Sequence, residues 1–427
     1  MQHAEQCNGS GDCRKTALSG GTMCPSFMAT KNEKDSTRAR ANILREFLTN
    51  SDKLKRFDHK EIYEVMDLCL SCKGCKSECP SNVDVAKLKA EFLQQYYDAN
   101  GVPFRSKLIA NFSSAAKLGS LVPGLYNLMV TTPFISNTIK RLSGFNVLRS
   151  MPTLYKTTLD KWHKSNSRSK RKLAHYPLSG NEGPKTIYLF CDEFTNYNDT
   201  EIGIKAITLL QKLGYEIIIP KHIESGRAWL SKGLIREGKK IANKNINLLK
   251  NIITADAPLI GIEPSAILTF RDEYIDLATD ENFEAAKILA KNVFFIDEFI
   301  AAEIDKGHIS KELFTKEKKL IKLHGHCQQK ALSSVEPSVK LLSFPENYTV
   351  ETIPSGCCGM AGSFGYEKEH YDLSMKIGEL VLFPAVRQQS DNVIVAAPGT
   401  SCRHQIKDGT GRKALHPVEV LYEALLP

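Results

Sequence analysis

The sequence predicts an α+β protein of several domains, in which an α-helical N-terminal domain precedes two α/β halves with parallel sheets. Three observations support this prediction. The chain has 427 residues, more than one hydrophobic core normally serves. Apolar residues in the N-terminal part recur at helical spacing, without an alternating strand pattern. From Lys185 onward, short apolar runs alternate with helical segments. We expect domains at 1–100, 101–183, 184–305 and 306–427.

Three helices are expected in the N-terminal domain. Ser36 or Asp35 can cap the first helix, which runs through Phe47. A second helical pattern covers residues 62–70 and leads into a group of cysteines. A third helix is expected over residues 83–97.

The segment 101–183 joins this domain to the α/β part. It is apolar at first, and residues 118–139 carry no charge. An apolar run of about 20 residues can span a membrane, but the prolines and polar residues here favour a buried helical hairpin or a docking surface. Residues 150–183 are expected to be a linker. Their basic stretch at 161–172 is either solvated or an electrostatic contact for a partner or membrane.

The α/β part contains two similar halves. Strands are expected at 186–190, 216–219, 259–262, 319–323, 349–353 and 393–397, with helices at 201–213 and 234–253. The halves look related because one strand leads to Cys191-Asp192 and a similarly placed strand leads to His324-Gly325-His326-Cys327.

Composition and charge narrow the class of protein. Hydrophobic residues make up 42% and charged residues 25%, as in folded soluble proteins. The net charge of +9 fits an acidic partner or an anionic membrane surface, whereas no nucleic-acid-binding motif is present. Residues 1–9 are polar and do not resemble a signal peptide. We therefore expect a cytoplasmic location with reduced cysteines, either free in solution or peripheral at the inner face of the membrane.

The strongest motif is the run from Cys69 to Pro80, with cysteines at 69, 72, 75 and 79. Its spacing, C-x2-C-x2-C-x3-C-P, is that of bacterial ferredoxins. Three thiolates on one loop can bind one cubane, and the fourth often binds another cluster. Gly74 is expected to let the backbone approach the sulfides, and Lys73 and Lys76 to offset the cluster's negative charge. The spacing favours iron–sulfur over zinc, whose paired ligands usually lie further apart. The expected ligands in this run are Cys69, Cys72, Cys75 and Cys79.

An irregular second group precedes this run. Cys7 and Cys13 have the first-to-third distance of the motif, with Ser10 in the middle, and Cys24-Pro25 resembles its end. If the crossed rule holds, Cys24 joins the cubane of Cys69, Cys72 and Cys75, and Cys79 joins Cys7 and Cys13. That second site could hold a three-iron cluster, or a four-iron cluster completed by Ser10 or water. Alternatively, the early cysteines only pack, and the domain holds one cluster.

A third constellation lies in the second α/β half. Cys327, the adjacent pair Cys357-Cys358, and Cys402 follow predicted strands, so they should converge at one sheet edge. Soft thiolates favour iron–sulfur or zinc, and His324 and His326 could be supporting donors or substitute ligands. A dithiol redox pair or inert packing remain alternatives.

These motifs together resemble a known family. The residues from Cys7 to Thr30, Ser36 to Ala41 and Lys89 to Leu93, with the ferredoxin run, are similar to the C-terminal iron–sulfur half of bacterial FAD-linked oxidases of D-lactate or D-2-hydroxyglutarate. The C-terminal part resembles the CCG domain shared by glycolate oxidase iron–sulfur subunits and heterodisulfide reductases. The matching residues are His326-Cys327, Gly356-Cys357-Cys358-Gly359-Met360-Ala361-Gly362-Ser363-Phe364-Gly365 and Ser401-Cys402-Arg403.

The resemblance implies an oxidoreductase component that passes electrons from FAD to a quinone or other acceptor in a 2-hydroxyacid dehydrogenase (D-lactate, glycolate or D-2-hydroxyglutarate). No G-x-G-x-x-G motif is present, so FAD is expected on a partner subunit or missing segment. The first half departs from the family, with Glu224-Ser225-Gly226-Arg227 and Glu263-Pro264-Ser265-Ala266 where cysteines are common. It is expected to be a scaffold without metal. The alternatives are a disulfide reductase similar to heterodisulfide reductase, and a zinc-bearing interaction module without catalytic activity.

Overall fold

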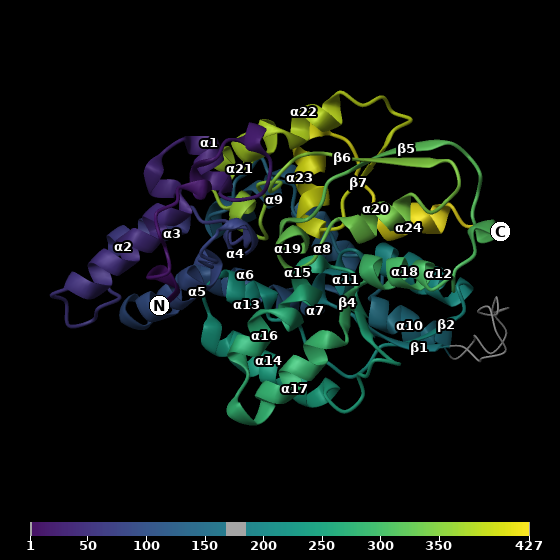
Figure 1. Cartoon of the computed structure of the whole chain (residues 1–427), viewed down its shortest axis with the longest axis horizontal. Coiled ribbons are helices and arrows are strands. Elements are labelled where there is room, and N and C mark those ends of the chain that lie inside the picture. Colours follow the sequence, from purple (N-terminus) through teal and green to yellow (C-terminus); the bar gives the residue numbers. More distant parts are fainter. Residues whose placement is uncertain (1, 168–184, 427) are drawn as a thin grey trace.

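The computed structural model describes residues 2–167 and 185–426. It has a helical N-terminal part followed by two α/β halves, each with a parallel sheet, which confirms the predicted fold class. In Figure 1 the N-terminal helices lie at one end of the molecule, and the C-terminus lies at the other end.

The N-terminal part consists of short helices around the cysteine loops. They are α1 (Pro25–Thr30), α2 (Thr37–Asn50), α3 (Lys60–Asp67), α4 (Gly74–Glu78) and α5 (Val85–Asn100). Ser36 caps α2 by accepting a hydrogen bond from the backbone of Ala39, as predicted. Asp84 caps α5 in the same way.

Four short helices follow: α6 (Phe104–Ala110), α7 (Phe112–Gly119), α8 (Pro123–Thr131) and α9 (Pro133–Ser143). A buried hairpin is wrong for this segment, because most of its large apolar side chains are exposed. Among the described residues, no helix is long and apolar enough to cross a bilayer. The expected linker contains a further helix, α10 (Leu159–Ser167), which includes the first basic residues of the 161–172 stretch, while residues 168–184 lie outside the described part.

The first α/β half has the strand order β2-β1-β3-β4, all parallel. The strands are β1 (Lys185–Phe190), β2 (Tyr215–Ile218), β3 (Leu259–Gly261) and β4 (Val293–Phe295). The sequence prediction missed β4, because three residues before a helix give no periodic signal. The helices are α11 (Glu193–Tyr197), α12 (Thr200–Lys212), α13 (Arg227–Ser231), α14 (Ile235–Leu249), α15 (Pro264–Ile267), α16 (Glu273–Leu277), α17 (Asp280–Lys291) and α18 (Ile296–Asp305).

The second half has the parallel strand order β6-β5-β7. The strands are β5 (Lys319–Leu323), β6 (Tyr348–Thr352) and β7 (Ile394–Ala396). The helices are α19 (Cys327–Leu332), α20 (Glu336–Leu342), α21 (Tyr371–Leu380), α22 (Leu382–Arg387), α23 (Thr400–Thr410) and α24 (Pro417–Glu423). One apolar core includes residues of both sheets, such as Leu189 and Leu323, and α12 packs against α24. The two halves therefore support each other.

Candidate metal centres

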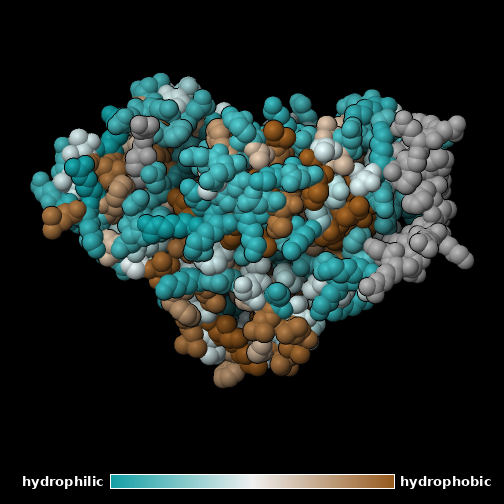
Figure 2. All heavy atoms as spheres, turned by 90° about the horizontal axis from the view of Figure 1, so that it is seen from below, coloured by the Kyte–Doolittle hydropathy of each residue, from teal (hydrophilic) through white to brown (hydrophobic). Residues whose placement is uncertain are grey.

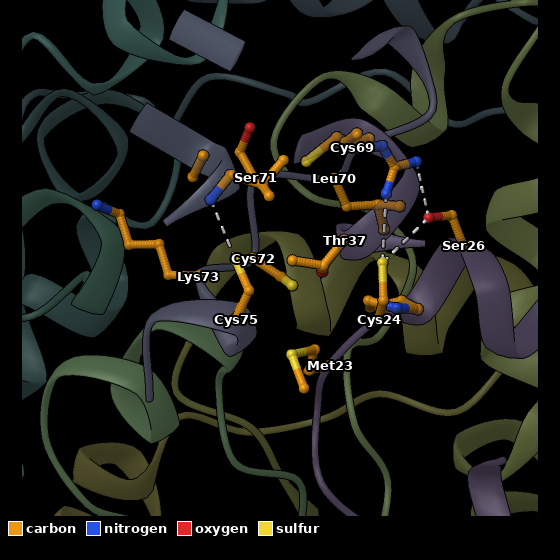
Figure 3. Close-up of a pocket in the computed structure, with 14 residues that line it drawn as sticks. Met23, Cys24, Ser26, Thr37, Cys69, Leu70, Ser71, Cys72, Lys73 and Cys75 are labelled. Atoms are coloured by element: carbon orange, nitrogen blue, oxygen red, sulfur yellow. Dashed lines mark hydrogen bonds between the residues drawn. The ribbon is translucent and has the colours of Figure 1, made fainter. Parts of the chain in front are cut away.

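Four cysteines from two distant stretches line one pocket (Figure 3). Cys24 lies at the start of α1, Cys69 and Cys72 lie in the loop between α3 and α4, and Cys75 lies in α4. This is the set that the crossed ferredoxin rule predicted for one cubane. All four thiols are free, and burial raises the pKa of Cys72 and Cys75 well above the usual range. Such buried thiols suit a bound cluster, because metal binding removes the protons that burial otherwise retains.

The backbone around the pocket is tightly wound. Ser71 and Lys73 have positive φ angles of 52° and 61°. A Cβ on Gly74 would lie 2.9 Å from the backbone nitrogen of Met23. Gly74 is therefore needed where the loop before Cys24 crosses α4, and its expected approach to cluster sulfides stays a prediction.

The two lysines of the cysteine loop, which were expected to offset the cluster's negative charge, form ion pairs with carboxylates. The Lys73 ammonium is buried, bonded to Asp272 and 2.8 Å from a carboxylate oxygen of Glu273, and Lys76 also binds Asp272. These carboxylates belong to the start of α16 and the residue before it. The lysines therefore fasten the cysteine loop to the first α/β half through ion pairs that the sequence analysis did not foresee.

The cation that donates directly to a thiol of the pocket is Arg40, which the sequence analysis did not single out. Its guanidinium is fully buried and donates to Cys24 Sγ at 3.3 Å, to the carbonyl of Asp35 and to Ser26. The nearby Cys24 and Cys69 thiolates raise the pKa of Arg40 against the opposing effect of burial. In the sequence, the signal that could have found Arg40 is its position on the apolar face of the helix that follows Cys24-Pro25.

The remaining N-terminal cysteines lie close to this pocket. Cys7, Cys13 and Cys79 belong to the same apolar cluster as Cys24 and Cys75. Cys13 is buried and accepts a hydrogen bond from the backbone of Arg38 at 3.4 Å, and burial raises the pKa of its thiol. Ser10, the candidate fourth ligand, is exposed, and its hydroxyl donates to the neighbouring Asp12.

The third constellation converges as the strand-end argument predicted. Cys327 starts α19 after β5, the Cys357-Cys358 pair follows β6, and Cys402 lies in α23 after β7. All four thiols are buried. Hydrogen bonds link Cys327 with Cys357, and link Cys358 with Cys357 and Cys402. These hydrogen bonds lower the pKa of Cys358, and that of Cys327 to about 7.

The two histidines of this region have different surroundings. His324 is fully buried, and its Nε2 lies within 4.8 Å of the sulfurs of Cys358 and Cys402 without a well-formed hydrogen bond. Its Nδ1 pairs with the hydroxyl of Ser355 at 2.7 Å. An imidazole that faces two thiols with one nitrogen, while a hydroxyl holds the other nitrogen, has the arrangement of a metal ligand. His326 instead caps α19 by accepting from the backbone of Gln328.

The two thiol sites adjoin each other. Cys72 of the first pocket and Cys327 and Cys357 of the second site lie in one small apolar cluster, and α4 packs against α19. The Cys327 thiolate contributes to the raised pKa of Cys72, after burial. A Cβ on Gly356 would lie 2.7 Å from the carbonyl oxygen of Gly21, so the two loops are in backbone contact.

The first α/β half has carboxylates at the corresponding strand ends. Glu193 is buried and accepts hydrogen bonds from the backbone and the hydroxyl of Ser225. Glu263 accepts from the backbone of Thr400, two residues before Cys402. Cys191 is buried in the core between the sheets. These contacts fit the predicted scaffold role.

Comparisons with known proteins agree with these thiol sites. Residues 6–84 match the model of a 4Fe-4S dicluster domain. The chain is 27% identical to D-2-hydroxyglutarate dehydrogenase of Escherichia coli K12, over 99% of this chain and 44% of that protein. It is 25% identical to one subunit of the anaerobic glycerol-3-phosphate dehydrogenase of the same strain, over 54% of this chain and 57% of that protein. Lactate utilization protein A of Macrococcus caseolyticus is 25% identical, over 55% and 95% of the two chains.

The chain thus spans less than half the length of the D-2-hydroxyglutarate dehydrogenases that it matches. Its likeness to them extends from the N-terminal cysteines through both α/β halves. Residues 6–84 are therefore a 4Fe-4S dicluster domain, in a chain homologous to D-2-hydroxyglutarate dehydrogenases and to a subunit of the anaerobic glycerol-3-phosphate dehydrogenase.

Proposed function

We propose that this chain is the electron-transfer part of a flavin-linked 2-hydroxyacid dehydrogenase, with a quinone or another molecule as the final acceptor. The observation that carries the proposal is the contact between the two thiol sites through Cys72, Cys327 and Cys357. Electron transfer requires centres that are close together and shielded from water. Bound clusters would supply the reversible one-electron redox chemistry, and the chain positions them and tunes their potential.

The proposal assigns the cysteines to three metal sites. Cys24, Cys69, Cys72 and Cys75 hold the first 4Fe-4S cluster, and Cys7, Cys13 and Cys79 hold a second cluster in the same domain. The third site consists of Cys327, Cys357, Cys358 and Cys402, with His324 as an added ligand. His324, Cys358 and Cys402 offer ligand atoms within 4.8 Å of one another, a donor set that suits zinc or an iron–sulfur cluster, and only a cluster there would extend the electron path.

The chain's own groups shape the first site. Arg40 donates to Cys24 Sγ, and the backbone nitrogen of Val85 donates to Cys75 Sγ at 3.4 Å. Such donors favour the more negative, reduced state of a thiolate-bound centre. Buried apolar residues such as Met23 and Phe27 exclude water from the same side.

The substrate and FAD belong to another chain or segment in this proposal. D-2-hydroxyglutarate dehydrogenases extend well beyond the part that this chain matches, and their name supports a 2-hydroxyacid as the electron donor. Lactate and glycolate remain within the proposed substrate class.

Metal counting on single-cysteine variants tests the assignment. The anaerobically purified chain should contain about seven or eight irons with matching sulfide from the N-terminal domain. Cys24→Ser and Cys79→Ser should each remove the signal of a different cluster in electron paramagnetic resonance, and Cys402→Ser should remove only the metal of the third site. Cys191→Ser is the control, because this buried cysteine lies in no proposed site. Loss of the same centre in Cys24→Ser and Cys79→Ser would refute the two-cluster assignment.

A disulfide reductase is the second candidate. The lowered pKa of Cys358 would suit a thiolate nucleophile. However, Cys327, Cys357, Cys358 and Cys402 are all at most 7% exposed, which restricts the access of a large disulfide. Disulfide turnover by the isolated chain with a reduced dye would favour this function over the first.

A further inference from the structure

The four short helices α6–α9 present an apolar surface that the electron-transfer function does not use. In Figure 1 they lie on the far side, and in Figure 2 hydrophobic side chains gather on a projection at the lower edge of the molecule. Their eight most exposed large apolar residues are 56–84% exposed: Phe104, Leu118, Leu121, Val122, Leu125, Leu128, Phe134 and Leu142. A contiguous surface of this kind marks an interaction site.

The distribution of side chains on these helices is the reverse of that on ordinary surface helices. Apart from Val130 in α8, the buried residues of these helices are small or polar, and most of the large apolar residues are turned outward. The buried residues include Ser106, Ala110, Ala116, Ser136 and Lys140. The exposed apolar side chains are therefore not the margin of a hydrophobic core beneath these helices.

The charge of the segment points to an anionic partner. Between Asp98 and Asp160 the sequence contains no acidic residue, whereas it contains seven basic ones: Arg105, Lys107, Lys117, Lys140, Arg141, Arg149 and Lys156. Lys107, Lys117 and Arg141 are exposed and form no ion pair with any carboxylate of the described residues. Apolar side chains interleaved with lysine and arginine suit an anionic lipid surface, where basic groups meet phosphates and apolar groups enter the acyl region.

The surface is held rigidly by the rest of the fold. The amide of Asn127 in α8 bonds both backbone groups of Leu154 at 2.8 Å. Phe112 in α7 stacks on Phe194 of the first half. Arg149 donates to the carbonyl of Gly365 in the second half. The exposed side chains are thus presented by a preformed layer fastened to both halves.

We propose that α6–α9 form a membrane-docking surface that binds the headgroup region of an anionic phospholipid leaflet. The outward leucines and phenylalanines enter the upper acyl region, and Lys107, Lys117 and Arg141 contact lipid phosphates. No described helix is long enough to span the bilayer, so the chain lies on the surface. A second copy of this chain fits less well, because two all-basic surfaces would repel each other.

Vesicle co-sedimentation of the full, metal-loaded chain tests the proposal. One set of vesicles contains phosphatidylcholine alone, and the other contains phosphatidylcholine with phosphatidylglycerol. The variant Leu125→Glu/Phe134→Glu removes the apolar anchor, and Lys107→Gln/Lys117→Gln removes exposed charge. The matched controls are Leu18→Glu/Leu54→Glu, at exposed apolar positions in the N-terminal part, and Lys239→Gln/Lys244→Gln on α14.

We expect the starting chain to bind the anionic vesicles and this binding to weaken with salt. The binding should fall at least tenfold in Leu125→Glu/Phe134→Glu and severalfold in Lys107→Gln/Lys117→Gln. Both control variants should bind as the starting chain does. Equal binding by the apolar double variant and the starting chain would overturn the proposal. So would the absence of binding to anionic vesicles at low salt. A third outcome would also overturn the proposal. In it, the starting chain does not bind vesicles, and light scattering shows that Leu125→Glu/Phe134→Glu breaks up a dimer or a complex with an added flavoprotein subunit. The surface is then a protein interface.

Discussion

Replacing Arg40 by glutamine should lower the reduction potential of the first cluster. The Arg40 guanidinium is buried and lies 3.3 Å from Cys24 Sγ, a proposed cluster ligand. Reduction adds one negative charge beside this cation, so the positive charge stabilises the reduced state. Glutamine keeps a donor of similar shape and removes the charge.

The magnitude follows from Coulomb's law. At 3.3 Å and an effective dielectric constant of about 20, two unit charges interact with about 5 kcal/mol. The added electron is spread over the cluster, and roughly doubling the mean distance reduces this to about 2.5 kcal/mol. Since about 1.4 kcal/mol corresponds to about 59 mV for a one-electron couple, the potential should fall by about 100 mV.

The assay is a redox titration followed by electron paramagnetic resonance, on protein with verified iron and sulfide content. Arg40→Lys should restore most of the potential, because it returns the charge without the planar fork. Arg149→Gln controls for the loss of a buried arginine, because Arg149 binds Gly365 and Ser374 elsewhere. A fully loaded Arg40→Gln protein with an unchanged potential would show that Arg40 has only a packing role.

Three further changes test other parts of the structure. His324→Gln should weaken metal binding at the third site by about 10- to 100-fold while the N-terminal clusters remain, and unchanged metal content would exclude His324 as a ligand. Burial raises the pKa of Asp192 to about 8, so the folded state retains a proton that the unfolded state releases near pH 4, and stability should fall as pH rises between these values. Asp192→Asn should flatten this dependence in thermal unfolding between about pH 4 and 8, and an unaltered slope would assign it to other groups. Lys73→Met should destabilise the loaded chain by about 3 kcal/mol in urea unfolding, because it leaves the buried carboxylate of Asp272 short of a partner. The control Lys31→Met, at an exposed lysine that also has a positive φ, should have little effect. Equal effects of the two variants would contradict this reasoning.

Local spacing carried most of what could be predicted from the sequence. Three cysteines of one pocket lie within seven residues, so their convergence depends on a single loop. Cys24 could be added to the predicted ligands of this cluster because Cys24-Pro25 resembles the end of the ferredoxin motif. The third site could be predicted because parallel strands end at one edge of the sheet, which brings Cys327, Cys358 and Cys402 together regardless of their separation in the chain.

Other features depend on contacts that no local pattern encodes. The partner of Lys73 lies 199 residues away, and lysines beside a cluster motif are plausible as cluster counterions until that partner is known. The composition of α6–α9 is equally compatible with a buried hairpin and an exposed surface. Which of the two forms depends on how small residues such as Ala116 fit against the halves, and this is a tertiary property.

The cysteine loop is fixed from two sides, which makes the N-terminal domain dependent on both α/β halves. Asp272 of the first half binds Lys73, Lys76 and Lys87, and these cations hold its pKa well below the usual range, so the contact persists through the physiological pH range. On the opposite side, Cys72 packs against Cys327 of the second half. The first half, which contributes no proposed metal ligand, thus still has a task at the proposed redox site: its Asp272 and Glu273 pair with lysines of the cysteine loop. Arg40 is then the cation that donates directly to the sulfur of a proposed ligand, whereas the buried Lys89 contacts the backbone carbonyl of Cys69, so replacing Arg40 should shift the potential.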